Sequence, residues 1–475
     1  MEPLSLTAAD IAASTGGRVV HGDPGAVIGR IVIDSRTLEA GDCFVAIEGE
    51  RFDGHDFVAD VLARGAGGVL VSRDLPGEAS RQVANAQQRP AGVVIRVDDT
   101  TRALQDVARE VRRRSGATVV AITGSAGKTT TKEVAAEFLA SRHRVFRNKG
   151  NLNNHIGLPL SLLELRARPE IAVVELGMNH PEEIRTLVGI AEPDIRVWTN
   201  VGDAHLGFFE SADAIADAKA EILDGANSDD VLVANANDSR VMSRAEWFLG
   251  RVVTFGIDTP ADVSAVHVEH RGLAGTSAEL RTPAGSATLA TPLLGLGNLS
   301  NVLAATAVAI QFDIPVSQIV ETARRLQPAT HRGELLRLPG GITLIDDSYN
   351  SSPAALRQAL DTVAAAAGCA RKVAVLGEML ELGAHTESLH RASGRAAAAA
   401  GLDLLIAVGG GPARALTDAA IAEGMPADAA IHVATNEEAA EAALARIRPG
   451  DLVLVKGSRG IGTDLVVARL KAEFA

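Results

Sequence analysis

The chain has 475 residues, of which 47% are hydrophobic and 22% are charged, and its formal net charge is −13. This composition is typical of a globular protein of about three domains, and it excludes wholesale disorder. The acidic balance and the 3% content of aromatic residues argue against a general nucleic-acid coat, which needs basic side chains and stacking rings.

Targeting and membrane signals are not recognisable in the sequence. The N-terminal segment carries acidic residues early and lacks a basic region followed by an apolar core. Uncharged apolar runs long enough for a transmembrane helix do not occur. Two cysteines, Cys43 and Cys369, cannot form a disulfide framework or a cysteine-based zinc site. We therefore expect a cytoplasmic protein with no membrane span and no nucleic-acid partner.

The first hundred residues alternate short apolar runs with turn signals, which predicts strands. The runs lie at 31–33, 43–47, 67–71 and 93–95. Leu104, Val107 and Val111 then recur at helical spacing. These patterns predict a small α/β domain over residues 1–100, followed by a helix.

From about residue 117 the sequence changes to regular alternation of apolar runs and helical segments. The runs lie at 118–122, 171–174, 195–199 and 231–234. Continuous apolar runs are typical of parallel strands buried on both faces, and such sheets bind ligands at the carboxyl ends of their strands. A short β excursion over 263–290 and a buried helix over 299–310 follow. We predict a central domain over 101–327 with a doubly wound parallel sheet.

A third alternating block predicts a smaller Rossmann-like domain over 328–475. Its expected strands lie at 342–345, 373–376, 404–408, 431–433 and 452–455. Alanine-rich runs at 363–367 and 396–400 are predicted as helices, since alanine is the best helix former. The expected fold class is therefore α/β with three domains.

The strongest motif follows the first central strand and opens a helix. It reads Thr123-Gly124-Ser125-Ala126-Gly127-Lys128-Thr129-Thr130. Glycines allow backbone N–H groups to surround a phosphate, Lys128 can meet the β- and γ-phosphates, and the Thr129 hydroxyl can bind Mg²⁺. The first glycine of the usual phosphate-loop pattern is Ile122 here. We favour nucleotide binding over a structural glycine turn because of the strand–turn–helix context.

Two polar residues follow later strands of the same domain. Glu175 ends the run at 171–174, and His205 follows the run at 195–199. At the carboxyl edge of a parallel sheet, Glu175 could be a metal ligand or a base. A solvated strand-end glutamate is an equal alternative, and a lone histidine is more often structural than a ligand.

Lys219 is an unusual residue on a predicted helix. Ser211 can cap the start of this helix, and Ile215, Ile222 and Leu223 share the face of Lys219. The helix pattern alone favours a lysine that extends its amine to solvent. The alternative is a functional lysine in a dry environment.

Polar loops follow further strands or join elements. The segment 150–154, with Asn153 and Asn154, could be a turn or the polar mouth of a site. Asp346 and Asp347 could bind ribose hydroxyls. The loop at 456–460 contains Lys456 and Arg459, which suit an anionic ligand, although such basic loops are often only solvated.

Together these motifs resemble the Mur ligase family of ATP-dependent amide-forming enzymes, over essentially the whole chain. The resemblance rests on the segments 34–36, 41–47, 52–55, 123–132, 150–160, 175–180, 199–205, 346–353, 376–383 and 456–460. It implies three domains, which bind the UDP end of one substrate, ATP, and the ribose side of ATP with the incoming amine. The segments 346–350, 376–383 and 456–460 are similar to the member that joins D-alanyl-D-alanine to UDP-N-acetylmuramoyl-tripeptide.

The resemblance also implies cofactors and roles for individual residues. It implies two Mg²⁺ ions, one on Thr129 and Glu175, the other on His205 and a carbamylated Lys219. A carbamate offers the oxygen ligands that Mg²⁺ prefers and an ammonium lacks. Further expected contacts are Asn298 and Asn301 near adenine, Asp347 near ribose, Arg332 near the phosphates, and Ser35, Arg36, Asn153, Asn154, Tyr349, Asn350, Lys456 and Arg459 toward the substrates.

The sequence departs from the family pattern at two places. Gly297 stands where the family often has histidine, and Gly462-Thr463-Asp464 replaces the usual Met and Glu. The implied chemistry runs through an acyl phosphate, which the amine of D-alanyl-D-alanine attacks. Three alternatives remain: a sister ligase that adds diaminopimelate or lysine to the UDP-dipeptide, a P-loop kinase or nucleotide switch, and a catalytically dead binding module. We expect a monomer.

Overall fold

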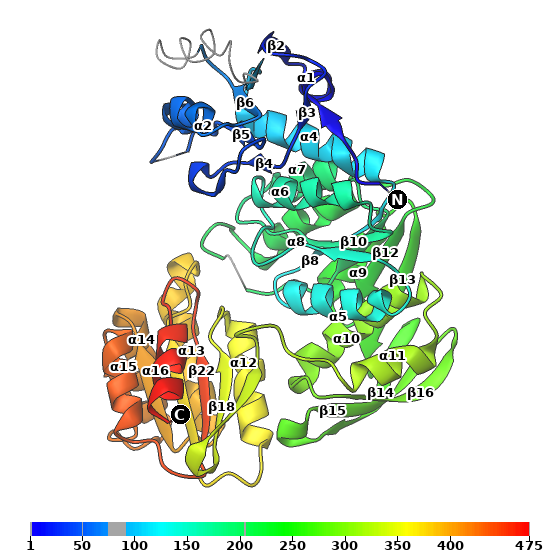
Figure 1. Ribbon diagram of the computed structural model, residues 1–475. Helices are drawn as coiled ribbons and strands as arrows, with labels where there is room; N and C mark the ends of the chain where they lie inside the picture. Colours follow the sequence, from blue (N-terminus) through cyan, green and yellow to red (C-terminus); the bar gives the residue numbers. More distant parts are fainter. Residues whose placement is uncertain (1, 50, 75–91, 204–205, 475) are drawn as a thin grey trace. The chain divides into compact units, whose positions relative to one another are not determined.

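The structure is a computed structural model, and it describes residues 2–49, 51–74, 92–203 and 206–474 (Figure 1). The chain divides into two compact units. One comprises residues 1–121, 143–178 and 182–194, and the other comprises residues 122–142, 179–181 and 195–475. The helices and strands of each unit are described in turn.

The N-terminal part of the first unit is built on a five-stranded sheet of order β2-β7-β6-β5-β4. Only β2 is antiparallel to its neighbour. The predicted strands at 31–33, 43–47, 67–71 and 93–95 are confirmed, whereas β2 and α1 were not predicted. The elements are β1 (Leu6–Thr7), α1 (Ala8–Thr15), β2 (Arg18–His21), β3 (Val27–Ile28), β4 (Ile31–Val32), β5 (Cys43–Val45), α2 (Val58–Ala63), β6 (Gly68–Val71), β7 (Val93–Arg96) and α4 (Thr100–Ser115).

The helix α4 confirms the expected apolar spacing, because Leu104, Val107 and Val111 are all buried. Asp99 caps its first turn by accepting hydrogen bonds from the backbone N–H groups of Thr101 and Arg102. The remaining elements of the first unit are β9 (Val145–Arg147), α6 (Gly157–Leu162), β10 (Ile171–Glu175) and α7 (Glu183–Ala191).

The central sheet has nine strands in the order β16-β15-β14-β13-β12-β11-β8-β10-β9. The strands from β11 to β14 are parallel, and the predicted β excursion over 263–290 forms the antiparallel strands β14, β15 and β16. The further elements are β8 (Thr118–Thr123), α5 (Lys128–Ala140), β11 (Ile195–Trp198), α8 (Ala212–Ala220), β12 (Val231–Asn235), α9 (Ser239–Ala245), β13 (Arg251–Ile257), β14 (Val263–His270), β15 (Thr276–Thr282), β16 (Gly285–Thr291), α10 (Gly295–Ile310) and α11 (Val316–Ala323).

The C-terminal part of the second unit is a six-stranded sheet of order β17-β18-β22-β19-β20-β21. Only β17 is antiparallel, and it was not predicted. The five predicted strands, β18 to β22, are all parallel, as expected for a Rossmann-like domain. Its elements are β17 (Glu334–Leu338), β18 (Ile342–Asp347), α12 (Pro353–Ala365), β19 (Lys372–Gly377), α13 (Thr386–Ala399), β20 (Leu404–Val408), α14 (Gly411–Ala422), β21 (Ala430–Val433), α15 (Asn436–Leu444), β22 (Leu452–Lys456) and α16 (Asp464–Glu473).

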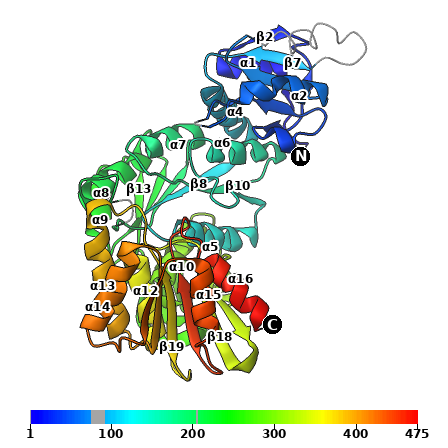
Figure 2. The same cartoon turned by 90° about the vertical axis from the view of Figure 1, so that its left-hand side faces the viewer.

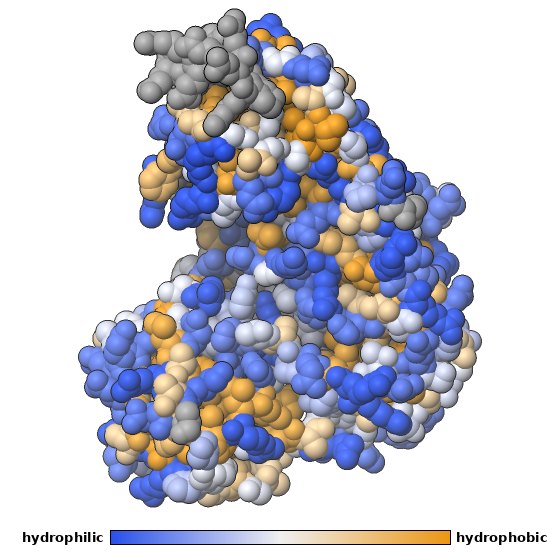
Figure 3. Space-filling view, in the orientation of Figure 1, coloured by the Kyte–Doolittle hydropathy of each residue, from blue (hydrophilic) through white to orange (hydrophobic). Residues whose placement is uncertain are grey.

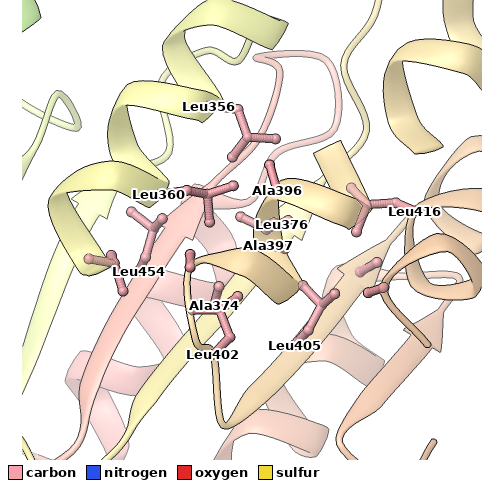
Figure 4. Packing of buried hydrophobic residues seen from close by; sticks show 14 of the residues in the cluster. Leu356, Leu360, Ala374, Leu376, Ala396, Ala397, Leu402, Leu405, Leu416 and Leu454 are labelled. Atoms are coloured by element: carbon pink, nitrogen blue, oxygen red, sulfur yellow. The ribbon is translucent and has the colours of Figure 1, made fainter. Parts of the chain in front are cut away.

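Helices cover both faces of this C-terminal sheet (Figure 2). Ala374 and Leu376 of β19 pack in one cluster with residues of α12, α13 and α14 (Figure 4). The alternate residues Val373 and Val375 pack on the opposite face with residues of α15 and α16. This alternation explains the continuous apolar run at 373–376, because each strand side chain meets one of two helical layers.

The alanine runs are helical only in part, which corrects the prediction. The helix α12 ends at Ala365 and α13 ends at Ala399, so the last residues of both runs lie outside the helices. Gly401, with a φ of 70°, follows α13. A left-handed glycine at this position ends a helix at low cost, and it overrides the helix propensity of alanine.

The surface drawn in Figure 3 is largely hydrophilic, with apolar patches between the polar residues. Within the described residues, helices long and apolar enough to cross a membrane are absent.

Candidate functional site

The phosphate-loop motif lies between β8 and α5, as the strand–turn–helix pattern predicts. Gly124 and Gly127 have φ values of 149° and 84°, which side-chain-bearing residues rarely adopt. A Cβ atom on Gly127 would lie 2.2 Å from Oδ1 of Asn301. Both glycines are therefore required by the backbone, and they leave backbone N–H groups at the start of α5 for an anion.

Three side chains hold this loop in place: Ser125 of the motif itself, and Thr199 and Asn200 of the segment 199–205, whose bracing role was not predicted. Asn200 Oδ1 accepts a hydrogen bond from the Ala126 N–H at 2.9 Å, and the Thr199 hydroxyl donates to the Ala126 carbonyl at 2.7 Å. The Ser125 hydroxyl accepts from the Gly202 N–H at 2.9 Å. Thr199 and Asn200 directly follow β11, and this position at a strand end is their signal in the sequence. The loop is thus braced on one side by the end of a neighbouring strand.

Lys128 is the first residue of α5, and its ammonium donates to the Gly124 carbonyl at 2.8 Å. This bond joins the first residue of α5 to Gly124 and so closes the loop between them. Thr129 and Thr130 follow in the first helical turn. The lysine charge and the helix N-terminus therefore both face the region that the glycines leave open.

Asn298 and Asn301 lie on the first turns of α10. Asn301 is buried, and its Oδ1 accepts from the Thr131 hydroxyl at 3.3 Å while its amide donates to Asn298 Oδ1 at 3.3 Å. The structure thus brings both asparagines beside the phosphate loop. Their contact with adenine stays a prediction.

A Cβ atom on Gly297 would lie 2.2 Å from Oε1 of Gln358 on α12, which is the far end of an exposed, flexible side chain. Gln358 can move aside, so the structure does not require glycine at position 297.

Lys219 lies on α8, whose first turn is capped by Ser211 as predicted, with the hydroxyl accepting from the Ala214 N–H at 3.1 Å. The side chain is only 1% exposed. The interpretation that it extends to solvent is therefore wrong, because Ile215 and Ile222 are fully buried beside it on the same face.

Burial lowers the pKa of Lys219 well below its usual value, and the positive charge of Lys128 lowers it further. Desolvation penalises the ammonium, and a second cation nearby adds repulsion. Among the residues that the structure describes, no carboxylate forms an ion pair with Lys219. A buried amine without such a partner favours its neutral, nucleophilic form.

His205 lies outside the described residues. The segment that follows it contacts the 376–383 motif: the Gly207 N–H donates to the Glu381 carbonyl at 2.7 Å. A Cβ atom on Gly383 would lie 2.8 Å from the Gly207 Cα. The two glycines therefore allow this motif to pack closely against the segment after β11.

Glu175 ends β10 in the first unit, and it is only 2% exposed. The interpretation of a solvated strand-end glutamate is therefore wrong. Asn153 donates its side-chain amide to Glu175 Oε1 at 2.8 Å, and Asn148 Oδ1 accepts from the Glu175 N–H at 3.1 Å. Asn148, which the sequence analysis missed, thus fixes the backbone of a carboxylate whose side chain Asn153 orients.

Asn154 has a structural role in the same loop, because its Oδ1 accepts from the Gly157 N–H at 2.8 Å at the start of α6. In the N-terminal sheet, Asp34 caps a short 3₁₀ turn that contains Ser35 and Arg36. The bidentate contact of Arg36 with Asp34, at 2.7 and 2.9 Å, lowers the pKa of Asp34 to about 2. Arg36 remains largely exposed.

The C-terminal domain gathers its candidate residues after β18 and β22. The Lys456 ammonium contacts Asp347 Oδ2 at 2.6 Å and the Asn350 carbonyl at 3.0 Å, and Lys456 is only 3% exposed. The alternative of a merely solvated basic loop is therefore wrong for Lys456, whose charge is paired internally.

The arginines of this domain lie near the Tyr349 ring. The Arg332 Cζ lies 4.1 Å from the ring centroid, and the Arg459 Cζ lies 5.8 Å from it. The backbone beside them is held by His331, whose Nδ1 lies 2.7 Å from Asp346 Oδ2. His331 was not predicted as a site residue, and its only signal in the sequence is its place directly before Arg332.

The described residues alone do not make a preformed metal cage. Within them, no three His, Cys, Asp or Glu side chains are grouped so that they could hold an ion. The Thr129 hydroxyl in the second unit and the Glu175 carboxylate in the first unit each offer an oxygen donor of the kind that Mg²⁺ prefers.

Family profiles match the chain in order along its length. The "Mur ligase family, catalytic domain" profile matches residues 27–112, the "Mur ligase middle domain" matches 122–309, and the "Mur ligase, glutamate ligase domain" matches 331–459. The chain is also 34% identical to the UDP-N-acetylmuramoyl-tripeptide–D-alanyl-D-alanine ligase of Bacillus subtilis (strain 168), over 94% of this chain and 93% of that protein.

Solved structures give the same result. A crystal structure of MurF from Acinetobacter baumannii has 32% identity and a TM-score of 0.87, and covers 99% of this chain and 100% of its own. MurF ligase from Thermotoga maritima in complex with ADP has 28% identity and a TM-score of 0.81, over 94% and 97% of the two chains. The resemblance seen in the motifs is thus confirmed, and the chain belongs to the Mur ligase family.

Proposed function

We propose that this chain joins D-alanyl-D-alanine to UDP-N-acetylmuramoyl-tripeptide with conversion of ATP to ADP and phosphate, as a step of peptidoglycan precursor synthesis. The observation that carries the proposal is the 34% identity to a ligase of that name over 94% of the chain. A braced phosphate loop and a buried lysine of lowered pKa support it, because a simple nucleotide switch has no use for the lysine.

In the first step, the terminal carboxylate of the UDP-tripeptide attacks the γ-phosphorus of ATP and releases ADP. The backbone N–H groups after Gly127 and the Lys128 ammonium bind the phosphates and stabilise the charge of the transferred phosphoryl group. Arg332 approaches the same phosphates from the C-terminal domain, and Asn298 and Asn301 lie on the adenine side. The product is an acyl phosphate, a far better electrophile than a carboxylate.

Mg²⁺ fits the donors of this chain, and bound Mg²⁺ supplies positive charge against phosphate oxygens. We propose that Thr129 and Glu175 hold one ion and that His205 and Lys219 hold a second. Lys219 reaches this role through carbamylation: its neutral nitrogen attacks CO₂, one proton leaves, and the carbamate offers two anionic oxygens. The lowered pKa of the amine supports this reaction, since an ammonium cannot attack CO₂.

In the second step, the free amine of D-alanyl-D-alanine attacks the acyl carbon, and phosphate leaves from the tetrahedral intermediate. Lys128 stabilises the added negative charge of that intermediate. Water must be excluded because it would hydrolyse the acyl phosphate. The C-terminal domain presents Tyr349, Asn350 and Arg459 toward the amine substrate in this proposal, and the buried Lys456 holds Asp347 and the Asn350 carbonyl in place behind them.

We further propose that residues 1–100 bind the UDP end, with Ser35 and Arg36 at that site and Asn153 and Asn154 along the peptide. Residues 101–327 bind ATP, and residues 328–475 bind the ribose, through Asp347, and the amine. The protein acts as a monomer in the cytoplasm, where ATP is available. Sedimentation of the pure chain at several concentrations tests the monomer, and a concentration-dependent mass contradicts it.

Phosphate release from ATP with UDP-tripeptide tests the activity itself. D-alanyl-D-alanine should give one ADP and one phosphate per amide bond, whereas diaminopimelate, lysine and the amine-free control should give only background. Amide formation between a UDP-dipeptide and diaminopimelate or lysine would assign the chain to the sister reaction. If the chain binds ATP but forms no amide with any amine, it is a nucleotide-binding module and not a ligase.

A further inference from the structure

The one tyrosine of the chain brings together two arginines from distant segments. Arg332 precedes β17, Tyr349 follows β18, and Arg459 follows β22. The Arg332 Cζ lies 4.1 Å and the Arg459 Cζ 5.8 Å from the centre of the Tyr349 ring. Both distances are within the range of a cation–π interaction.

The backbone of this cluster is fixed independently of its side chains. The Tyr349 N–H donates to the His331 carbonyl at 3.1 Å. His331 is in turn bound through Nδ1 to Asp346, 2.7 Å away, and the Ser348 hydroxyl donates to the same carboxyl group at 2.6 Å. Asp346 and Ser348 are each 1% exposed. The backbone at Tyr349 is therefore held by a buried network.

The charges around the cluster are unequal. Lys456 is paired with Asp347 at 2.6 Å, so its charge is largely balanced. Among the described residues, no carboxylate lies within ion-pair distance of Arg332. Arg459 approaches only Asp464, at 3.3 Å, and its side chain is 61% exposed. Two cations held at one ring repel each other, and an anion that contacts both relieves this repulsion.

We propose that Tyr349 is a positioning residue that holds Arg332 and Arg459 for two anionic groups, the phosphates of the nucleotide and the carboxylate of the incoming dipeptide. The identity of the dipeptide rests on the proposed function. The face of the ring attracts the two guanidinium groups and holds them in position, and the phenol hydroxyl is not required. The ring thereby links the nucleotide side of the site to the amine side.

The test compares Tyr349→Phe with Tyr349→Leu in steady-state kinetics. Tyr349→Leu should raise KM for both ATP and D-alanyl-D-alanine by about three- to tenfold each, the range of one lost cation–π contact, with a smaller change in kcat. Tyr349→Phe keeps the ring and should restore most of both losses. A merely structural role would lower the melting temperature and the active fraction without moving both KM values, so melting curves accompany the kinetics.

A double-mutant cycle with Arg459→Ala provides the second readout. If Tyr349 acts through Arg459, the KM effects of Tyr349→Leu and Arg459→Ala on the dipeptide should be non-additive. Additive effects, unchanged KM values in Tyr349→Leu, or an equal loss in Tyr349→Phe would each overturn the proposal.

Calorimetry with ADP separates this inference from the proposed function. ADP binding should weaken in Tyr349→Leu whichever amine the enzyme accepts, because Arg332 serves the nucleotide. If the wild-type chain rejects D-alanyl-D-alanine but ADP binding still depends on the ring, then only the proposed function fails. If ADP binds equally to wild type and Tyr349→Leu, the nucleotide half of this inference fails.

Discussion

Two buried lysines, one in the central domain and one in the C-terminal domain, are held in opposite ways. Lys456 ends β22 at 3% exposure and contacts Asp347 at 2.6 Å. Lys219 lies on α8 at 1% exposure, and the positive charge of Lys128 adds to burial in lowering its pKa. Burial is thus the same in both, whereas the partner is an anion in one and a cation in the other.

Lys456 therefore stabilises the fold, whereas burial of Lys219 costs free energy. A paired ammonium keeps its charge and links two strand ends. An unpaired amine is destabilising, since its desolvation is not offset by a counter-charge. Such a group is retained for its chemistry, and perturbed pKa values are concentrated at functional sites for this reason. The following predictions test whether this distinction holds.

The largest expected effect is on activity at Lys219. Lys219→Ala should lose about 10²-fold or more in kcat because the proposed carbamate is lost, while the variant still folds. Lys219→Arg should be equally poor, since a guanidinium stays charged and cannot be carbamylated in this way. Acetate or formate should restore part of the activity of Lys219→Ala. A fully active Lys219→Arg enzyme would disprove the carbamate.

The next effect concerns the stability of the paired lysine. Lys456→Met removes one partner of the Asp347 contact and leaves a carboxylate that is 23% exposed. We expect the free energy of unfolding to fall by about 2 kcal/mol, less than for a fully buried pair. Urea unfolding provides the measurement, and Lys471→Met on the surface of α16 is the matched control. Equal midpoints for the two variants would show that the contact contributes nothing.

Substitution of Lys219 by methionine should not lower the free energy of unfolding, in contrast to Lys456→Met. Lys219→Met replaces an unpaired buried amine with an apolar side chain of similar length. The free energy of unfolding should stay unchanged or rise by about 1 kcal/mol, measured in urea without bicarbonate or nucleotide. A loss larger than that of Lys456→Met would mean that Lys219 has a stabilising partner and would remove the contrast between the two lysines.

The sequence predicted most of the fold because the signals were local. Continuous apolar runs predicted the parallel strands, and the spacing of Leu104, Val107 and Val111 predicted α4. The strands β9, β13 and β17 were missed, since short or mixed strands such as Val145–Arg147 have partly exposed side chains and lack a continuous apolar run. The left-handed Gly401 also ended α13 earlier than the helix propensity of alanine alone predicts.

The phosphate loop was predictable because its motif lies between a recognisable strand and a recognisable helix. Helical spacing placed Lys219 on the apolar face of its helix. The burial of its amine could not be predicted, because a long side chain can reach solvent or remain buried. Asn148 and Asn200 were missed because each supports a segment distant in sequence. The cluster around Tyr349 joins residues more than a hundred positions apart, which no local pattern shows.

The smallest effect concerns the coupling of Lys219 to Lys128. The positive charge of Lys128 lowers the pKa of Lys219 in addition to burial, so Lys128→Met should raise that pKa. A higher pKa leaves less neutral amine at a given pH, and the carbamate also loses a nearby cation that stabilises it. Both effects act in the same direction.

The carbamate signal of Lys219 in ¹³C-bicarbonate NMR should therefore be weaker in Lys128→Met than in wild type at equal pH and bicarbonate. It should be abolished only in Lys219→Met, because burial, the larger cause of the pKa shift, is unchanged in Lys128→Met. An equal or stronger signal in Lys128→Met would show that burial alone prepares the amine. In that case Lys128 serves only the nucleotide, and Lys128 and Lys219 act independently.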